Sequence, residues 1–227
     1  MDKLLPILAR LKKITSKIIP IIIWVAYPIV IIMLFASLLT SNPYLRISKG
    51  LYESHNDITF DHNYVAKELI DYLNYKHDDL SFGGSESDTE QIMDEQEVKH
   101  MEDVKILYTR LRILAGVSLL IVITLTAYMY YKDKPLLYHT YKNIFWLPLG
   151  FLIFVGTWFL IDFARIFTWF HELLFDNDDW MIENYNVLIP LLPENFWLVS
   201  GVIILFGTVI ALGFTVFISH RFLKTLS

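Results

Sequence analysis

The sequence predicts an all-α integral membrane protein with four transmembrane helices, both termini in the cytoplasm and a small extracytoplasmic subdomain between the first two helices. Hydrophobic residues make up 55% of the 227 residues, and they gather in four continuous blocks. Each block exceeds the roughly 20 residues that a helix needs to cross the hydrocarbon of a bilayer. The blocks, and therefore the predicted spans, are 18–39, 111–131, 144–170 and 196–218.

Charged residues in the connections predict the orientation of the spans. Lys and Arg collect in the N-terminal arm 1–17, the connection 132–143 and the C-terminal tail 219–227. The connections 40–110 and 171–195 are rich in Asp and Glu. Because cytoplasmic loops carry an excess of Lys and Arg, we expect the first three segments in the cytoplasm and the other two outside. The net charge of −5 then averages a basic inner side and an acidic outer side.

The first apolar block is expected to be a retained membrane anchor. A signal peptide has an apolar region of about 7–15 residues followed by a small-residue cleavage site. This block is longer, and residues 39–43 offer no such site. The chain also has no Cys. This excludes a disulfide-bonded outer subdomain, a thiol nucleophile and a cysteine-ligated metal.

The segment 40–110 contains the part of the chain that is expected to fold outside the bilayer. Asp61 has the residue type and position of a helix N-cap. The apolar face of that helix is predicted to be Val65, Leu69, Tyr72 and Leu73. A loop rich in Gly, Ser and acids follows over 77–90, and helical signal then resumes near Ile92 and continues without a breaker into the second span.

Two histidines stand at the predicted outer edge of the membrane. His100 precedes the second span and His171 follows the third. Histidine titrates near neutrality and is suited to proton transfer. Glu97 and Asp103 share one side of the predicted helix with His100, and Glu172 adjoins His171, so carboxylates are available to orient both rings. The alternative for each histidine is an interfacial side chain that only hydrogen-bonds a neighbour.

Charged residues also occur inside the third apolar block, at Asp162 and Arg165. A charge at the centre of a membrane helix costs about 2.5–3.5 kcal/mol, so such residues are functional candidates. Their three-residue spacing permits an intrahelical ion pair, and the other interpretation is that Arg165 holds a lipid ester or carbonyl. The following loop contains Trp180, which favours a position along the headgroup layer, as a lid over a site beneath.

Metal-binding patterns are incomplete. His171-Glu172 begins like the zinc-protease helix motif, but Phe175 stands in place of its second histidine. The Glu-x-x-His spacing of Glu97 and His100 occurs once, whereas di-iron bundles need two copies. The sequence has no Gly-rich phosphate loop, serine-nucleophile elbow or nucleic-acid recognition pattern. We therefore predict no metal, no cofactor and no nucleic-acid partner.

Three sequence blocks resemble those of one bacterial four-span family. They read EVKHMEDVK over 97–105, FHELLFDNDDW over 170–180 and LIPLLPENF over 188–196. In order, spacing and number of spans, nearly the whole chain resembles the lipoprotein intramolecular transacylase (Lit) family. The chain departs from the family pattern at Asn186, where an acid is expected, and matches only loosely over 44–95.

The resemblance implies a reaction in the outer leaflet of a bacterial cell membrane. Family members move the sn-2 acyl chain of a diacylglyceryl-modified Cys onto the α-amino group of the same Cys, which gives an N-acyl lyso-form lipoprotein. Diacylglyceryl-modified lipoproteins would be the substrates. Attack by the amine closes an eight-membered ring, which an enzyme favours by holding the folded conformer. Because an amide replaces an ester, neither ATP nor a metal is required.

The resemblance also implies roles for the candidate residues. His100 would accept the proton of the substrate ammonium group, and His171 would donate a proton to the departing oxygen or a hydrogen bond to the oxyanion, with Arg165 as an alternative oxyanion donor. These two roles are interchangeable. The other candidates would support the site or orient the substrate: Glu97, Asp103, Asp162, Arg165, Glu172, Asn177 and Trp180.

Two other classes of function stay open. One is a non-enzymatic membrane sensor or metal-binding module that uses His55, His62 or His77 in the acidic outer segment. The other is an outer-leaflet acyltransferase that acts between separate lipids. That enzyme would change the mass of its product, whereas an intramolecular transfer leaves the mass unchanged. The oligomeric state is also open.

Overall fold

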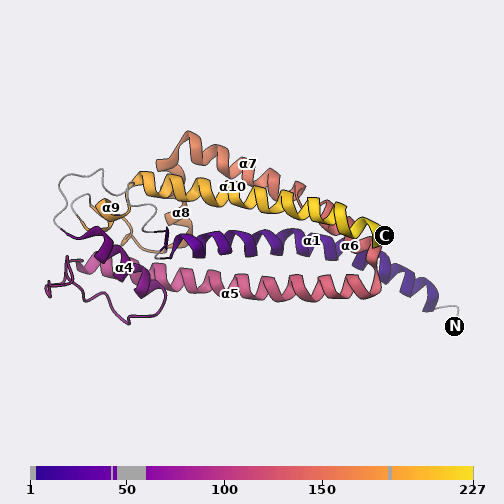
Figure 1. Cartoon of the computed structure of the whole chain (residues 1–227), viewed down its shortest axis with the longest axis horizontal. Coiled ribbons are helices and arrows are strands. Elements are labelled where there is room, and N and C mark those ends of the chain that lie inside the picture. Colours follow the sequence, from indigo (N-terminus) through magenta and orange to yellow (C-terminus); the bar gives the residue numbers. More distant parts are fainter. Residues whose placement is uncertain (1–3, 42, 45–59, 184–185, 227) are drawn as a thin grey trace. The chain divides into compact units, whose positions relative to one another are not determined.

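The computed structural model is all-helical in the part of the chain that it describes, residues 4–41, 43–44, 60–183 and 186–226 (Figure 1). Its elements are α1 (Leu4–Leu39), α4 (His62–Leu73), α5 (Glu95–Lys132), α6 (Lys134–Lys142), α7 (Trp146–Ile161), α8 (Phe163–Leu174), α9 (Leu188–Leu191), α10 (Glu194–Ile218), the π-helix η1 (Ser219–Leu223) and the 3₁₀-helix η2 (Lys224–Leu226). Four stretches are long and apolar enough to cross a membrane: Lys12–Leu39, Glu95–Lys132, Lys134–Ile161 and Glu194–Leu223. The predicted all-α class with four such helices is confirmed, and the cytoplasmic location of both termini stays a prediction.

The chain divides into two compact units. Unit 1 comprises Met1–Leu34, Ile113–Gly156 and Leu205–Ser227, and unit 2 comprises Phe35–Arg112 and Thr157–Ile204. All the candidate site residues named from the Lit resemblance belong to unit 2. The fold of unit 2 therefore decides whether they meet.

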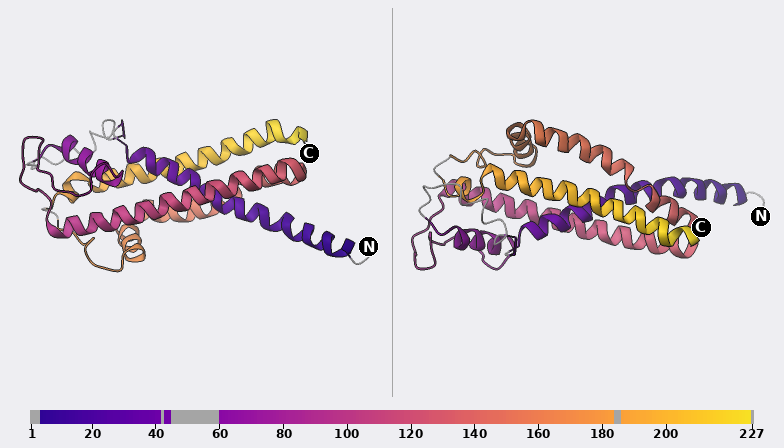
Figure 2. Two further views of the ribbon diagram at one scale, coloured as in Figure 1. Left: turned by 90° about the horizontal axis from the view of Figure 1, so that it is seen from below. Right: turned by 45° about the horizontal axis from the view of Figure 1, so that its top comes forward.

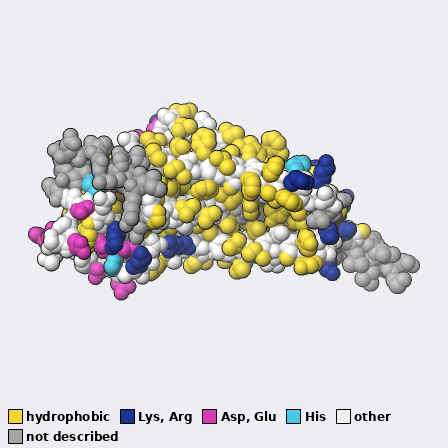
Figure 3. All heavy atoms as spheres, in the orientation of Figure 1, with side chains coloured by type: hydrophobic (Ala, Val, Ile, Leu, Met, Phe, Trp, Pro, Cys, Tyr) yellow, Lys and Arg dark blue, Asp and Glu magenta, His cyan; other side chains and the backbone are white. Residues whose placement is uncertain are grey.

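Polar contacts join the helices of unit 1. The indole N–H of Trp24 on α1 donates to the carbonyl of Thr140 on α6 over 2.8 Å. The Tyr27 hydroxyl lies 2.8 Å from that of Thr215 on α10, and the Tyr27 ring meets Tyr141 edge-on. α6 also packs against η1, next to the C-terminal end of the chain (Figure 2). Large apolar side chains stay exposed on α5, α7 and α10, as expected of helices that face lipid (Figure 3).

In unit 2, α4 forms as the sequence predicts. The Asp61 carboxylate caps its first turn by accepting hydrogen bonds from the backbone N–H groups of Asn63 and Tyr64 at 2.9 and 3.2 Å. The predicted apolar face is buried: Val65, Leu69, Tyr72 and Leu73. The chain leaves α4 through Tyr75, whose φ of 61° lies in the left-handed region. This turn folds the chain back beside α4.

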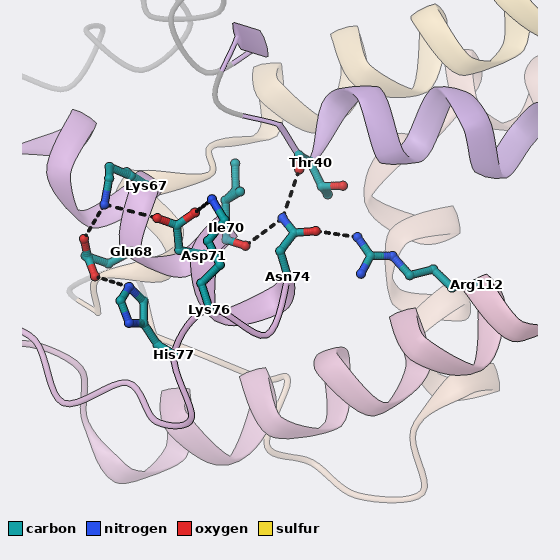
Figure 4. Close-up of polar contacts among 9 residues, drawn as sticks. All are labelled: Thr40, Lys67, Glu68, Ile70, Asp71, Asn74, Lys76, His77 and Arg112. Carbon is teal, nitrogen blue, oxygen red and sulfur yellow. Dashed lines mark hydrogen bonds and ion pairs between the residues drawn. The ribbon is translucent and has the colours of Figure 1, made fainter.

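Asn74, at the end of α4, connects this helix to two others (Figure 4). Its side-chain N–H donates to the Thr40 carbonyl at 3.4 Å, and its Oδ1 accepts from the Arg112 guanidinium. Arg112 also lies over the Tyr108 ring, 4.2 Å from the centroid, and the Tyr108 hydroxyl hydrogen-bonds the Thr40 hydroxyl. These bonds tie α4 to the end of α1 and to α5, the helix that carries His100.

The second and third apolar stretches behave differently. α5 runs without interruption through the second stretch, as the absence of a breaker predicts. In the third, α7 ends at Ile161, and Asp162 caps a new helix, α8, by accepting a hydrogen bond from the Arg165 N–H at 3.1 Å. The stretch 144–170, expected as one span, is thus interrupted, because an Asp side chain that bonds the following backbone competes with the helix.

Candidate active site

His100 and His171 lie together within unit 2. His100 is on α5 and His171 is in the last turn of α8. Both are buried, each with 8% of its surface exposed. Their ring centroids are 5.9 Å apart, and the ring planes make an angle of 37°. The fold therefore brings together the two histidines that the sequence singles out, close enough for one bound group to contact both.

Aromatic side chains surround the pair. The His100 ring meets Phe175 nearly edge-on at 5.4 Å between centroids. The His171 ring lies 4.2 Å from Phe167 and is stacked on Trp180 at 5.0 Å and 29°. These rings exclude water from the histidines, and a dry site strengthens electrostatic interactions with a reacting group.

The proton of His171 is fixed by its surroundings. Its Nδ1 lies 2.7 Å from the Phe167 carbonyl oxygen. Because a carbonyl only accepts, Nδ1 carries the hydrogen and Nε2 keeps its lone pair. Burial lowers the pKa of His171, and the hydrogen bond to Phe167 only partly opposes this effect. The lowered pKa favours the neutral ring, whose Nε2 can accept a proton.

His100 has an unused polar atom. Its Nδ1 is buried and has no hydrogen-bond partner among the residues that the structure describes. Leaving a buried polar atom unsatisfied costs about 1–3 kcal/mol. A ligand that hydrogen-bonds this nitrogen recovers that free energy, so His100 is suited to contact a bound substrate.

Gln96 holds the loop after α8 (residues 176–183) next to the histidine pair. Its side-chain amide donates to the carbonyl oxygens of Asp179 at 3.3 Å and Met181 at 3.2 Å. These two carbonyls flank Trp180, whose ring stacks on His171. Gln96 therefore holds the backbone on both sides of the stacked ring.

Asp103 holds the same loop from another point on α5. Its carboxylate accepts a hydrogen bond from the Asn177 side-chain amide at 2.7 Å. Gln96 and Asp103 lie about one turn before and one turn after His100. α5 thus presents His100 between two side chains that fasten the loop carrying Trp180.

Glu97 is almost completely buried, with 1% of its surface exposed. Glu97 and Asp94 form a capping box at the start of α5: the Asp94 N–H donates to Glu97 Oε2 at 3.1 Å, and the Glu97 N–H donates to Asp94 Oδ1 at 2.8 Å. Glu97 Oε1 also accepts from the backbone N–H of Leu188 at 2.8 Å, and Asp94 accepts from the Asn186 side chain. Glu97 thus fastens the start of α9 to the start of α5.

The sequence matches one known protein family. The family model described as "Lipoprotein intramolecular transacylase Lit" matches residues 14–197. The chain belongs to the Lit family. The predicted family membership is therefore confirmed, and the family name makes the chain a transacylase that modifies lipoproteins. A search of curated proteins finds no match.

Solved Lit structures share the fold. The membrane-integral Lit from Bacillus cereus matches with a TM-score of 0.67 and 18% identity, covering 94% of this chain and 99% of that one. A variant of the same protein with one histidine replaced by alanine matches with a TM-score of 0.71 and 18% identity, covering 96% and 97%. The fold is thus shared over nearly the whole length.

Sequence reasoning missed two contributors to the geometry of this Lit-family site. Asp94 could have been found, because Asp-x-x-Glu before a helical stretch is the signature of a capping box. Gln96 had no local signal, because its partners, the Asp179 and Met181 carbonyls, come from a distant loop. Such contacts exist only once the tertiary fold has formed.

The remaining predicted site residues lie on α8 or next to it. Arg165 Nε pairs with Asp162 Oδ2 at 3.3 Å, and the Arg165 side chain is 81% exposed. This ion pair joins the N-cap of α8 to its first turn, at the three-residue spacing that the sequence shows. Glu172 is exposed beside the buried His171. Substrate-orienting roles for these three residues stay predictions.

A second group of titratable side chains lies at the end of α4 (Figure 4). Ligand atoms of Glu68, Asp71 and His77 lie within 4.8 Å of one another, a donor set that zinc accepts. Lys67 and Lys76 already bond the Asp71 carboxylate at 3.1 and 2.7 Å. Burial disfavours the charge of Asp71, but the bonds from Lys76 and Lys67 outweigh it and hold the pKa of its carboxyl below the usual value.

These lysines supply the positive charge that a metal ion would bring, so the cluster is a poor metal site as it stands. The other two histidines of the metal-binding alternative do not strengthen it. The His62 ring packs against Phe60 at 4.9 Å between centroids, and His55 lies outside the described residues.

Proposed function

We propose that this chain transfers the sn-2 acyl chain of a diacylglyceryl-Cys lipoprotein onto the α-amino group of the same Cys. Membership of the Lit family supports the reaction class. The observation that carries the proposal is the buried His100–His171 pair, with its unpartnered Nδ1 on His100 and an Nε2 lone pair on His171. These are groups that an aminolysis of an ester needs.

The reaction is balanced within one substrate molecule. The amine nitrogen attacks the sn-2 ester carbonyl, an N–C bond forms, and the C–O bond to the glycerol breaks. The proton that the nitrogen loses ends on the sn-2 oxygen, so neither water nor a second substrate is consumed. The protein contributes by holding the eight-membered arrangement and by moving one proton.

We assign the proton transfer to His171 and the contact with the reacting carbonyl to His100, which exchanges the roles that we first gave to the two histidines. Burial favours the neutral form of His171, and its Nδ1 is bonded to the Phe167 carbonyl, so Nε2 can take the proton from the amine and return it to the departing oxygen. His100 can donate a hydrogen bond to the oxyanion that forms during attack. Trp180 and Phe175 would keep water away from the intermediate.

The predicted topology places this chemistry at the extracytoplasmic leaflet. Unit 2 contains the acidic segments that the charge distribution assigns to the outside, and both histidines belong to it. The lipid chains of a mature lipoprotein are anchored in that leaflet, so the ester would lie at the depth of the pair.

Tandem mass spectrometry of a lipoprotein's N-terminal peptide tests the proposal. The host lacks other N-acylating enzymes and carries either the wild-type chain, His100→Ala or the control His139→Ala, whose exposed histidine belongs to unit 1. The expected product with the wild type and the control has an unchanged total mass and fragments that place one acyl chain on the amine. His100→Ala should leave the amine free.

Two results would contradict the proposal. Full activity of His100→Ala would show that the reaction does not need the histidine pair. A product that gains the mass of an acyl chain would show transfer between separate lipids, which is the acyltransferase alternative.

A further inference from the structure

Unit 1 contains a cavity of about 450 Å³ that is separate from the histidine pair. It lies where the end of α6, the start of α7 and the C-terminal end of α10 with η1 come together. Its polar lining consists of Lys142, Asn143 and His220. The volume falls within the range of about 300–1,000 Å³ that is usual for small-ligand sites. We call it the basic cavity.

Two polar side chains of the basic cavity, Lys142 and His220, both contact Tyr138. Lys142 Nζ lies over the Tyr138 ring, 5.3 Å from the centroid. The Tyr138 hydroxyl lies 3.1 Å from Nδ1 of His220. His220 is in η1, a π-helical turn, and such turns are rare and frequently mark functional sites. The cationic and imidazole groups are therefore positioned before any ligand arrives.

The other wall of the basic cavity is apolar. It is formed by Phe145, Trp146 and Val216. Trp146 is 69% exposed. Apolar surface continues along α7 at Leu147 and along α10 at Phe217, which are 52% and 62% exposed. A ligand with a polar head and a hydrocarbon chain can thus contact the polar lining and the apolar wall at once.

The segments that form the basic cavity carry Lys and Arg but no Asp or Glu. Residues 134–156 and 205–226 contain four Lys or Arg, namely Lys134, Lys142, Arg221 and Lys224, and no Asp or Glu. Figure 3 shows Lys, Arg and His side chains gathered beside apolar ones at the end of the molecule near the C-terminus. Basic pockets between membrane helices bind the headgroups of anionic lipids, because each Lys or Arg near the surface attracts them.

We propose that the basic cavity binds an anionic phospholipid. The phosphate lies against Lys142 and His220, and an acyl chain follows the wall made by Trp146 and Val216. The predicted topology places this end of the chain in the cytoplasmic leaflet. The inference does not depend on the proposed acyl transfer, because it rests on residues of unit 1 alone.

Native mass spectrometry of the purified full chain tests this inference. The chain in detergent is titrated with phosphatidylglycerol and, separately, with phosphatidylcholine that has the same acyl chains. The wild type should bind phosphatidylglycerol more tightly. Lys142→Gln should weaken phosphatidylglycerol binding about five-fold, the effect of one basic group at a lipid headgroup, and leave phosphatidylcholine binding unchanged. His220→Gln, from a different element, should act in the same direction.

Lys132→Gln is the matched control. It removes the same charge from the end of α5, in a different groove that also contains Asp133. It should leave phosphatidylglycerol binding unchanged. Trp146→Ala should weaken binding of both lipids, because it removes the apolar wall that their chains share.

Three results would overturn the inference. Equal losses of phosphatidylglycerol affinity with Lys142→Gln and Lys132→Gln would show that the lipid responds to surface charge in general and not to the basic cavity. Equal binding of the two lipids by the wild type would remove the headgroup preference. Displacement of phosphatidylglycerol by an equal concentration of sn-glycerol 3-phosphate would make a free phosphate, and not a lipid, the ligand.

Discussion

The His100–His171 pair and the Glu68–Asp71–His77 cluster both place a histidine among titratable side chains of unit 2, yet they differ in burial and in how their polar atoms are bonded. The pair is buried among aromatic rings, and one of its nitrogens has no partner among the described residues. In the cluster, the His77 side chain is 45% exposed and its Nε2 lies 3.0 Å from Glu68, while two lysines neutralise Asp71.

The difference shows why residue type alone does not define a catalytic site. Proton transfer needs a group whose lone pair or hydrogen is not already used, in a place from which water is excluded. His171 is buried, its Nδ1 is bonded to a carbonyl, and its Nε2 has no hydrogen bond among the described residues, so it meets both conditions. In the cluster the charged groups bond one another, and these ion pairs hold the end of α4 in place.

The largest expected effect comes from removing the base while keeping its hydrogen bond. His171→Asn leaves an amide N–H that can still reach the Phe167 carbonyl, but it has no group that titrates. We expect the rate of N-acylation to fall about 10²–10⁴-fold, the usual contribution of general acid–base catalysis. The initial rate of conversion, followed by mass spectrometry of the lipoprotein peptide, measures it.

The matched substitution in the cluster is His77→Asn, and it should leave the rate unchanged. A comparable loss with His77→Asn would mean that the cluster takes part in the reaction. A His171→Asn variant with wild-type activity would require another proton acceptor.

A smaller effect is expected from Gln96, which acts through Trp180. Gln96→Ala removes both hydrogen bonds that flank the stacked ring. Because a small displacement of a positioned group is costly, we expect roughly a ten-fold fall in kcat, with little change in thermal stability. Gln91→Ala is the control, since Gln91 donates to the nearby Met93 carbonyl and, among the described residues, to no part of the loop 176–183. Equal rates for both variants would show that catalysis does not depend on the Gln96 hydrogen bonds on either side of Trp180.

The pH dependence of stability separates the two regions. Burial lowers the folded-state pKa of His171 below its ordinary 6.5, so the unfolded chain binds more protons as the pH falls. The stability that depends on neutral His171 is present above pH 6.5 and is lost as the pH falls, by at most about 1.4 kcal/mol per pH unit. The carboxyl of Asp71 also has a lowered pKa, but its ordinary value is 3.8, so its loss begins at lower pH.

Thermal midpoints between about pH 7.5 and pH 5 measure this difference. The wild-type midpoint should fall on acidification, and the slope should be smaller in His171→Asn. Asp71→Asn should keep the wild-type slope over this range. An unchanged slope in His171→Asn would mean that this histidine does not titrate differently in the folded and unfolded chains.

The sequence predicted most of the fold, because its signals are local. Apolar block length identified four helices, a capping residue located α4 at Asp61, and the absence of breakers predicted a continuous α5. The interruption at Asp162 was missed because a three-residue spacing to Arg165 fits two local structures. The same spacing allows an ion pair within one helix and an N-cap that begins a new helix. The structure has the N-cap, and the Asp162–Arg165 ion pair forms beside it.

The site was predictable only in part. His100 and His171 could be named because their positions at the ends of apolar blocks place them at one membrane edge. Their separation of 5.9 Å, the stacking of Trp180 and the clamp by Gln96 depend on how distant segments pack. Glu97 was expected to orient His100. In the structure both oxygens of its carboxylate instead accept hydrogen bonds from backbone N–H groups, those of Asp94 and Leu188.

The smallest expected effect is on the stability of the cluster itself. Asp71→Asn keeps a hydrogen-bond acceptor for Lys76 and Lys67 but removes the charge. Because those lysine side chains are 57% and 50% exposed, water and salt weaken the ion pairs, and we expect a loss of about 1 kcal/mol or less at pH 7. Glu95→Gln, which breaks the exposed pair with Lys99, should cost less still. N-acylation by Asp71→Asn should match the wild type, and a fall as large as that of His171→Asn would mean that the two regions act as one site.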